Sequence, residues 1–65
     1  MSFGEFMKKM RKQENMSQRE LADKVGVVEY SISRYETDKV LPQLDIAEKI
    51  VNALGCRLEI VKDVK

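Results

Sequence analysis

Residues 17–36 carry the pattern that most restricts how this chain can fold. Ser17 and Glu20 have the spacing of a capping box, in which two side chains satisfy backbone amides at the first turn of a helix. Apolar residues then recur at helical spacing at Leu21, Ala22 and Val25. Gly26 follows them and predicts the end of this helix, because glycine adopts positive φ without a steric penalty.

A second short helix is predicted directly after the turn, from about Val28 to Thr37. At about 100° per residue, one side carries Val28, Ile32, Tyr35 and Glu36, and the opposite side carries Tyr30, Ser33, Arg34 and Thr37. The first side is expected to face the core, whereas the second has no aliphatic member. Two helices joined this tightly form a helix-turn-helix, and such a polar outer face is suited to reading base edges in the major groove of DNA.

Further helices are predicted on both sides of this unit. Ser2 and Glu5 form another capping box, which starts an apolar stripe at Phe3, Phe6, Met7 and Met10. Pro42 lies at the end of a loop, and Gly55 ends a helix of about a dozen residues. The apolar positions of that helix are Leu44, Ala47, Ile50, Val51 and Leu54. Residues 1–55 are therefore expected to form a compact all-α DNA-binding domain of four or five helices.

The hydrophobic period changes in the C-terminal segment, residues 56–65. Charged and apolar residues alternate there, and the β-branched Ile60 and Val61 favour a strand. A lone strand would stay frayed, become an irregular fifth element, or pair with the same strand of a second copy across a two-fold axis. We expect the last arrangement, with dimer contacts at Arg57, Leu58, Glu59, Ile60 and Val61.

Composition excludes several classes of function. The 65 residues include one cysteine, Cys56, and no histidine, so neither an internal disulfide nor a Cys/His metal site is expected. No nucleophile with a base partner and no phosphate-binding glycine loop is visible, so we expect a protein without enzymatic activity, metal or cofactor. The absence of a long apolar run and of a signal peptide predicts a cytoplasmic protein with no membrane partner.

The charge balance makes a single copy a weak binder of nucleic acid. Twelve Lys and Arg residues stand against eleven Asp and Glu residues, which gives a net charge of only +1. Because phosphate contacts supply much of the affinity for DNA, useful binding is expected to need a homodimer with two reading helices.

The chain resembles the phage repressor and Cro-type helix-turn-helix regulators, a group also described as xenobiotic-response-element-like, over about residues 5–55. The residues that carry the resemblance are Ser17-Gln18-Arg19-Glu20-Leu21-Ala22, Val25-Gly26-Val27 and Ile32-Ser33-Arg34-Tyr35-Glu36. The resemblance implies a helical bundle whose second helix lies over the DNA backbone and whose third helix enters the major groove.

Several residue roles follow from the same resemblance. Gln18 matches a position that commonly touches a phosphate and braces the reading helix. Arg11 and Glu36 match a partly buried ion pair between the first and third helices. The principal base-facing positions match Glu29, Tyr30 and Arg34, with Ser33 beside them.

The chain departs from the resemblance at Asp38, where relatives often have glycine. Aspartate can adopt the left-handed conformation required there, but its charge would repel a nearby phosphate. Lys39 is therefore the better candidate for a backbone contact. The expected DNA-binding residues are Gln18, Arg19, Glu29, Tyr30, Ser33, Arg34, Thr37 and Lys39.

Three base-facing side chains have alternative roles. Arg34 either donates two hydrogen bonds to a guanine or stays solvated, and the motif favours the guanine contact. Tyr30 either contacts a sugar, a thymine methyl group or a phosphate, or packs on the start of its helix. Glu29 either accepts from a cytosine amine or only stabilises the positive end of its helix, and the structural role is slightly favoured.

The sequence thus predicts a sequence-specific DNA-binding protein that binds double-stranded DNA as a dimer and either represses transcription, which is favoured, or regulates it in another way. Residues 28–37 would read a near-palindromic operator. The alternative is an antitoxin or adaptor whose main partner is another, toxin-like protein, and which also binds DNA at its own promoter. A steep loss of DNA affinity with salt would favour the first hypothesis, and stable copurification with another chain would favour the second.

Overall fold

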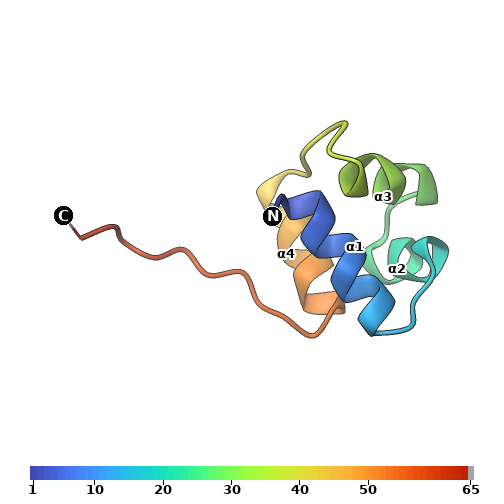
Figure 1. Ribbon diagram of the computed structural model, residues 1–65, viewed down its shortest axis with the longest axis horizontal. Helices are drawn as coiled ribbons and strands as arrows, with labels where there is room; N and C mark the ends of the chain where they lie inside the picture. Colours follow the sequence, from blue (N-terminus) through green and yellow to red (C-terminus); the bar gives the residue numbers. More distant parts are fainter. Residues whose placement is uncertain (65) are drawn as a thin grey trace.

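Four α-helices make up the regular structure in the computed structural model, which describes residues 1–64. They are α1 (Phe3–Gln13), α2 (Gln18–Val25), α3 (Glu29–Glu36) and α4 (Leu44–Ala53) (Figure 1). Helix α3 packs against α1 and α2, and α2 also packs against α4. The predicted all-α bundle is confirmed, with four helices in the part of the chain that is described.

Both predicted capping boxes are present. Ser2 Oγ accepts a hydrogen bond from Glu5 N at 3.1 Å, and Glu5 Oε1 accepts one from Ser2 N at 3.2 Å. The corresponding distances for Ser17 and Glu20 are 3.0 Å and 2.9 Å. These bonds set the starts of α1 and α2, because they satisfy amides that have no partner within the helix.

A residue with left-handed backbone follows each helix. These residues are Asn15, Gly26, Asp38 and Gly55, with φ values of 56°, 85°, 59° and 77°. Glycine and, less readily, asparagine and aspartate tolerate this conformation, which lets the chain leave each helix in a tight turn.

Fully buried apolar side chains from all four helices meet in the core. They are Met7 from α1, Leu21 from α2, Ile32 from α3 and Ile50 from α4, with Leu54 directly after α4. Burial of these side chains is the main favourable contribution to the packing of such short helices, which are marginal in isolation.

Two residues expected in the core are exposed instead. Val28 is 67% exposed, because it precedes α3 with extended backbone (ψ 152°) and therefore does not follow the helical phase. Leu44 is 61% exposed as the first residue of α4. The predicted inward positions Ile32 and Glu36 are buried, and Tyr35 is half-buried.

The predicted C-terminal strand is wrong. Residues 56–64 have no regular secondary structure, and this tail extends away from the bundle (Figure 1). A strand exists only through ladder hydrogen bonds to a neighbour, and residues 1–64 contain no strand that could pair with Arg57, Leu58, Glu59, Ile60 and Val61. The alternation of charged and apolar residues was therefore not enough to predict a strand.

Among the described helices, none is long and apolar enough to cross a membrane.

Candidate nucleic-acid interface

The turn between α2 and α3 is held by backbone hydrogen bonds and by an apolar contact. Gly26 N and Val27 N both donate to Ala22 O, at 2.8 Å and 3.1 Å. The Val27 side chain packs partly buried against the core cluster. The two helices are therefore joined rigidly, with Ile32 directing one side of α3 into the core.

Glu36 joins α3 to both preceding helices. Its Oε2 accepts from Arg11 Nε at 2.6 Å, and its Oε1 accepts from Arg11 Nη2 and from Gln18 Nε2, each at 3.1 Å. Arg11 Nη1 also donates to Met16 O at 2.8 Å. Because Arg11 and Glu36 are buried, each needs this opposite charge and these hydrogen bonds. The bond from Arg11 to Glu36 raises the pKa of Arg11, against the opposing effect of burial.

A second junction attaches the end of α3 to the start of α1. The Asp38 carboxylate accepts from Ser2 Oγ at 2.7 Å and from Gly4 N at 3.2 Å. Gly4 is buried here, and a Cβ on it would lie 2.4 Å from Tyr35 O. The carboxylate thus satisfies an amide at the N-terminus of α1, where negative charge is favourable. Sequence reasoning missed this link, because nothing local connects residues so far apart in the chain.

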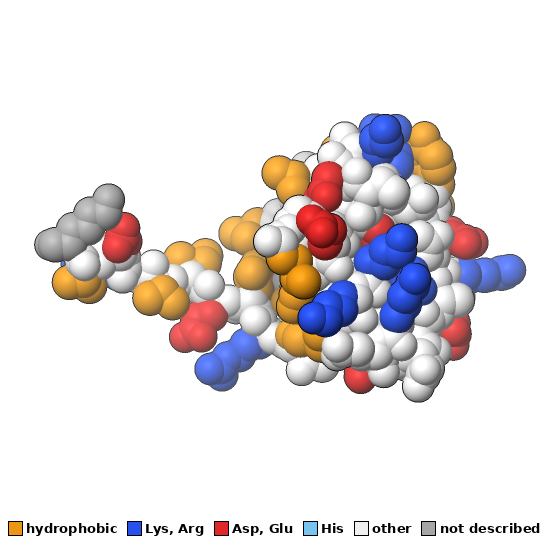
Figure 2. Space-filling model, viewed as in Figure 1, with side chains coloured by type: hydrophobic (Ala, Val, Ile, Leu, Met, Phe, Trp, Pro, Cys, Tyr) orange, Lys and Arg blue, Asp and Glu red, His pale blue; other side chains and the backbone are white. Residues whose placement is uncertain are grey.

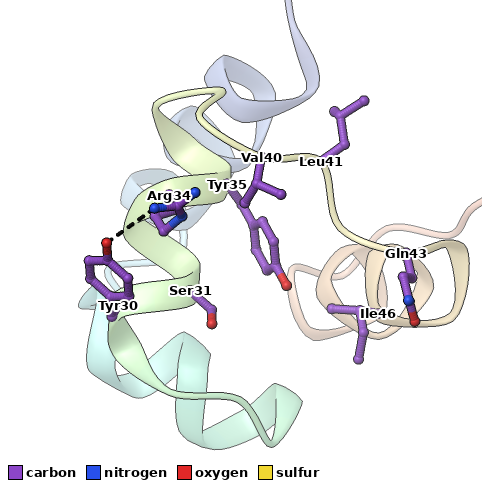
Figure 3. Close-up of a pocket in the computed structure, with 8 residues that line it drawn as sticks. All are labelled: Tyr30, Ser31, Arg34, Tyr35, Val40, Leu41, Gln43 and Ile46. Carbon is purple, nitrogen blue, oxygen red and sulfur yellow. Dashed lines mark hydrogen bonds between the residues drawn. The ribbon is translucent and has the colours of Figure 1, made fainter.

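The outer side of α3 carries a direct contact between two predicted DNA-binding side chains. Arg34 Nη1 donates to the Tyr30 hydroxyl oxygen at 3.1 Å, and the guanidinium carbon lies 5.6 Å from the centre of the Tyr30 ring (Figure 3). Near the end of the helix, Thr37 Oγ1 donates to Ser33 O at 2.9 Å. The polar group of Thr37 is therefore already used within the helix.

The other predicted DNA-binding residues lie around this contact without joining it. Gln18 starts α2 and is half-buried against Glu36. Arg19, Glu29 and Lys39 are exposed, at the first turn of α2, the first residue of α3 and the loop after Asp38. Within residues 1–64, the side chains of Arg19, Glu29 and Lys39 make no hydrogen bond or ion pair.

An open hollow of about 480 Å³ lies between α3 and the loop that leads to α4 (Figure 3). Its lining residues are Tyr30, Ser31, Arg34, Tyr35, Val40, Leu41, Gln43 and Ile46. Sequence reasoning treated residues 40–42 only as part of a loop, and so missed that Val40 and Leu41 form one wall. Among residues 1–64, no cluster of His, Cys, Asp or Glu side chains is arranged to hold a metal ion.

Comparison with known proteins places this geometry in a family. Residues 7–61 match the family model described as helix-turn-helix. The SPbeta prophage-derived uncharacterized HTH-type transcriptional regulator YonR of Bacillus subtilis (strain 168) is 38% identical over 53 residues. The matched region covers 82% of this chain and 49% of that relative, so the chain spans about half the length of the curated relative that it matches. The chain belongs to the Cro/C1-type helix-turn-helix family.

Proposed function

We propose that this chain is a sequence-specific DNA-binding regulator of transcription, and that it represses by occupying an operator as a dimer. The observation that carries the proposal is the two-sided character of α3. Ile32 and Glu36 attach one side to the bundle, while Tyr30 and Arg34 occupy the opposite side. Family membership and the transcriptional-regulator name of the relative support the same function, and they support a binding role without enzymatic activity.

Base readout is assigned to the outer side of α3. The guanidinium of Arg34 has donors spaced to match O6 and N7 of a guanine in the major groove. Glu29 is exposed at the start of α3 and can accept from a cytosine amine, and Ser33 lies one position before Arg34. Such contacts specify sequence, whereas contacts with phosphates only position the protein.

Phosphate contacts are assigned to residues around α3. Gln18 donates one amide hydrogen to Glu36, and its remaining donor can bind a phosphate while α2 and α3 stay joined. Lys39 is exposed, and its amide donates to Arg34 O at 2.9 Å, which holds the lysine near the end of α3. Arg19 is the remaining candidate for contact with the DNA backbone, whereas Thr37 would first have to give up the hydrogen bond from its hydroxyl group to Ser33 O.

A dimer is proposed because one copy offers few contacts and little net charge. Two reading helices about 34 Å apart would contact successive major grooves of a near-palindromic operator. The contact between copies is assigned to Arg57, Leu58, Glu59, Ile60 and Val61. In support, Ile60 and Val61 are exposed, and apolar side chains continue from the bundle onto the tail (Figure 2). A hollow of about 280 Å³, partly lined by Leu44, Leu58 and Ile60, lies at the same place.

A second candidate function is binding to another protein, as an antitoxin or adaptor does. The exposed apolar side chains of Ile60, Val61 and Val64 favour it, because large exposed apolar surfaces commonly mark protein contacts. Purification of the chain with a second, toxin-like protein at fixed stoichiometry would support this role, which is compatible with DNA binding.

The decisive experiment selects bound duplexes from random DNA and then compares variants on the selected duplex and on a random duplex. Arg34→Ala is expected to weaken binding to the selected duplex about tenfold or more, with a much smaller effect on the random duplex. Lys49→Ala is the matched control, because it removes one exposed positive charge from α4. Equal losses on both duplexes would remove the assignment of base readout to Arg34.

A further inference from the structure

Tyr30 and Arg34 lie four residues apart on α3, so their side chains are neighbours on the helix surface. Figure 3 shows the guanidinium turned toward the phenol, where the hydrogen bond of 3.1 Å forms. The ring also lies within the range of a cation–π contact, at 5.6 Å from the guanidinium carbon. Two separate features of Tyr30, its oxygen and its ring, therefore contact the same cation.

We propose that Tyr30 is a positioning residue for Arg34, and that its hydroxyl group increases the preference of Arg34 for a guanine over other bases. This inference rests on the proposed DNA-binding function. In it, Tyr30 acts through Arg34 and does not contact DNA independently.

The donor count of the pair is compatible with this task. A guanidinium has five N–H donors and no acceptor, and the bond to Tyr30 uses one hydrogen of Nη1. Enough donors remain for two parallel bonds to O6 and N7 of a guanine. The Tyr30 oxygen acts as the acceptor in this contact.

Restraint of Arg34 increases specificity by removing competing arrangements. A free arginine side chain samples many rotamers, and binding must restrict them at a cost in entropy. The same freedom lets it bond a phosphate, a contact that carries no sequence information. Arg34 held by Tyr30 is already oriented, so its binding to the preferred base becomes more favourable relative to its binding to any other partner.

The chain offers a clean variant and a matched control. Tyr30 is 68% exposed, so Tyr30→Phe removes one oxygen atom while the ring and the core stay in place. Tyr35→Phe removes a hydroxyl group from the same helix, and Figure 3 shows the Tyr35 ring directed toward Ile46 and away from Arg34.

The experiment measures affinities of full-length variants for the selected duplex and for duplexes with single base-pair changes. The position at which Arg34→Ala loses its preference identifies the guanine. At that position, Tyr30→Phe is expected to lower the preference about three- to tenfold, with unchanged or slightly higher affinity for a random duplex, because the released Arg34 can bond a phosphate. Tyr30→Phe is expected to have no further effect in the Arg34→Ala background, and Tyr35→Phe is expected to behave as wild type.

Different results would overturn different conclusions. Additive losses from Tyr30→Phe and Arg34→Ala would show that Tyr30 contacts DNA independently, and would overturn only the positioning role. A wild-type chain that prefers no duplex would overturn the proposed function together with this inference. A measurement without DNA separates the two: NMR should show faster rotation of the Arg34 guanidinium in Tyr30→Phe than in wild type. Equal rates would contradict the restraint itself.

Discussion

At the scale of single residues, Gly4 sets how closely α1 approaches α3. A Cβ at this position would lie 2.4 Å from Tyr35 O and 2.8 Å from Glu36 O. Both are backbone atoms, which cannot rotate away as a side chain can. The absence of a side chain at Gly4 therefore allows the Asp38 carboxylate and the end of α3 to contact the first turn of α1.

Gly4→Ala is expected to lower the free energy of unfolding by about 1–3 kcal/mol, because the added methyl group forces the two helices apart. Urea denaturation followed by circular dichroism measures this change. Lys9→Ala in the same helix is the control, since an exposed substitution should change stability by less than about 0.5 kcal/mol. A variant as stable as wild type would show that the junction is looser than its geometry indicates.

At the scale of elements, the start of α2 depends on a charged cap. The bonds from Ser17 to the Glu20 carboxylate lower the pKa of Glu20, because they favour its ionised form. A group whose pKa is lower in the folded state stabilises the fold above its unfolded pKa, and this contribution disappears as the pH falls through the folded pKa. Acid should therefore weaken α2, the helix that carries Gln18 against Glu36.

The melting temperature of wild type is expected to fall more steeply on acidification than that of Glu20→Gln. The difference between them should be largest above pH 4.5, the ordinary value for glutamate, and should shrink below it. Glu48→Gln, at an exposed position of α4 outside any cap, is the control and should parallel wild type. Parallel curves for wild type and Glu20→Gln would contradict a role for this charge in the cap.

At the scale of the whole molecule, the tail makes the protein elongated. The principal extents are 41, 23 and 21 Å, and the long dimension includes the extended C-terminal segment in Figure 1. Ile60 and Val61 are 81% and 75% exposed on this segment, which is unfavourable for apolar side chains in water. A second copy that covers them would also supply the second reading helix of the proposed operator complex.

The double substitution of Ile60→Ser and Val61→Ser is expected to shift the protein from dimer to monomer in analytical ultracentrifugation. Because neither side chain contributes to the core, the circular dichroism spectrum should stay unchanged. Affinity for the selected duplex should fall, since the two reading helices are no longer linked. Val64→Ser is the control for loss of an exposed apolar residue outside the assigned contact. An unchanged dimer would place the interface elsewhere.

The sequence by itself determined the features that depend on neighbouring residues. Ser2 and Ser17 start their helices through bonds that span three positions, and Gly26 ends α2 through its own backbone freedom. The helical phase also separated Ile32 on the inner side of α3 from Arg34 on its outer side. These signals are local, so the helix-turn-helix could be recognised before any contact between distant residues was known.

Only the tertiary structure decided the features that depend on distant residues or on side-chain direction. The Asp38 carboxylate bonds to Gly4 N across 34 positions of the chain, which no local pattern encodes. The spacing of Tyr30 and Arg34 indicated that their side chains could meet. It could not predict which atoms would form the contact, because each side chain has several rotamers. Residues 57–61 have the alternation of a strand and yet form none, because a strand requires a neighbouring backbone and the described chain supplies none.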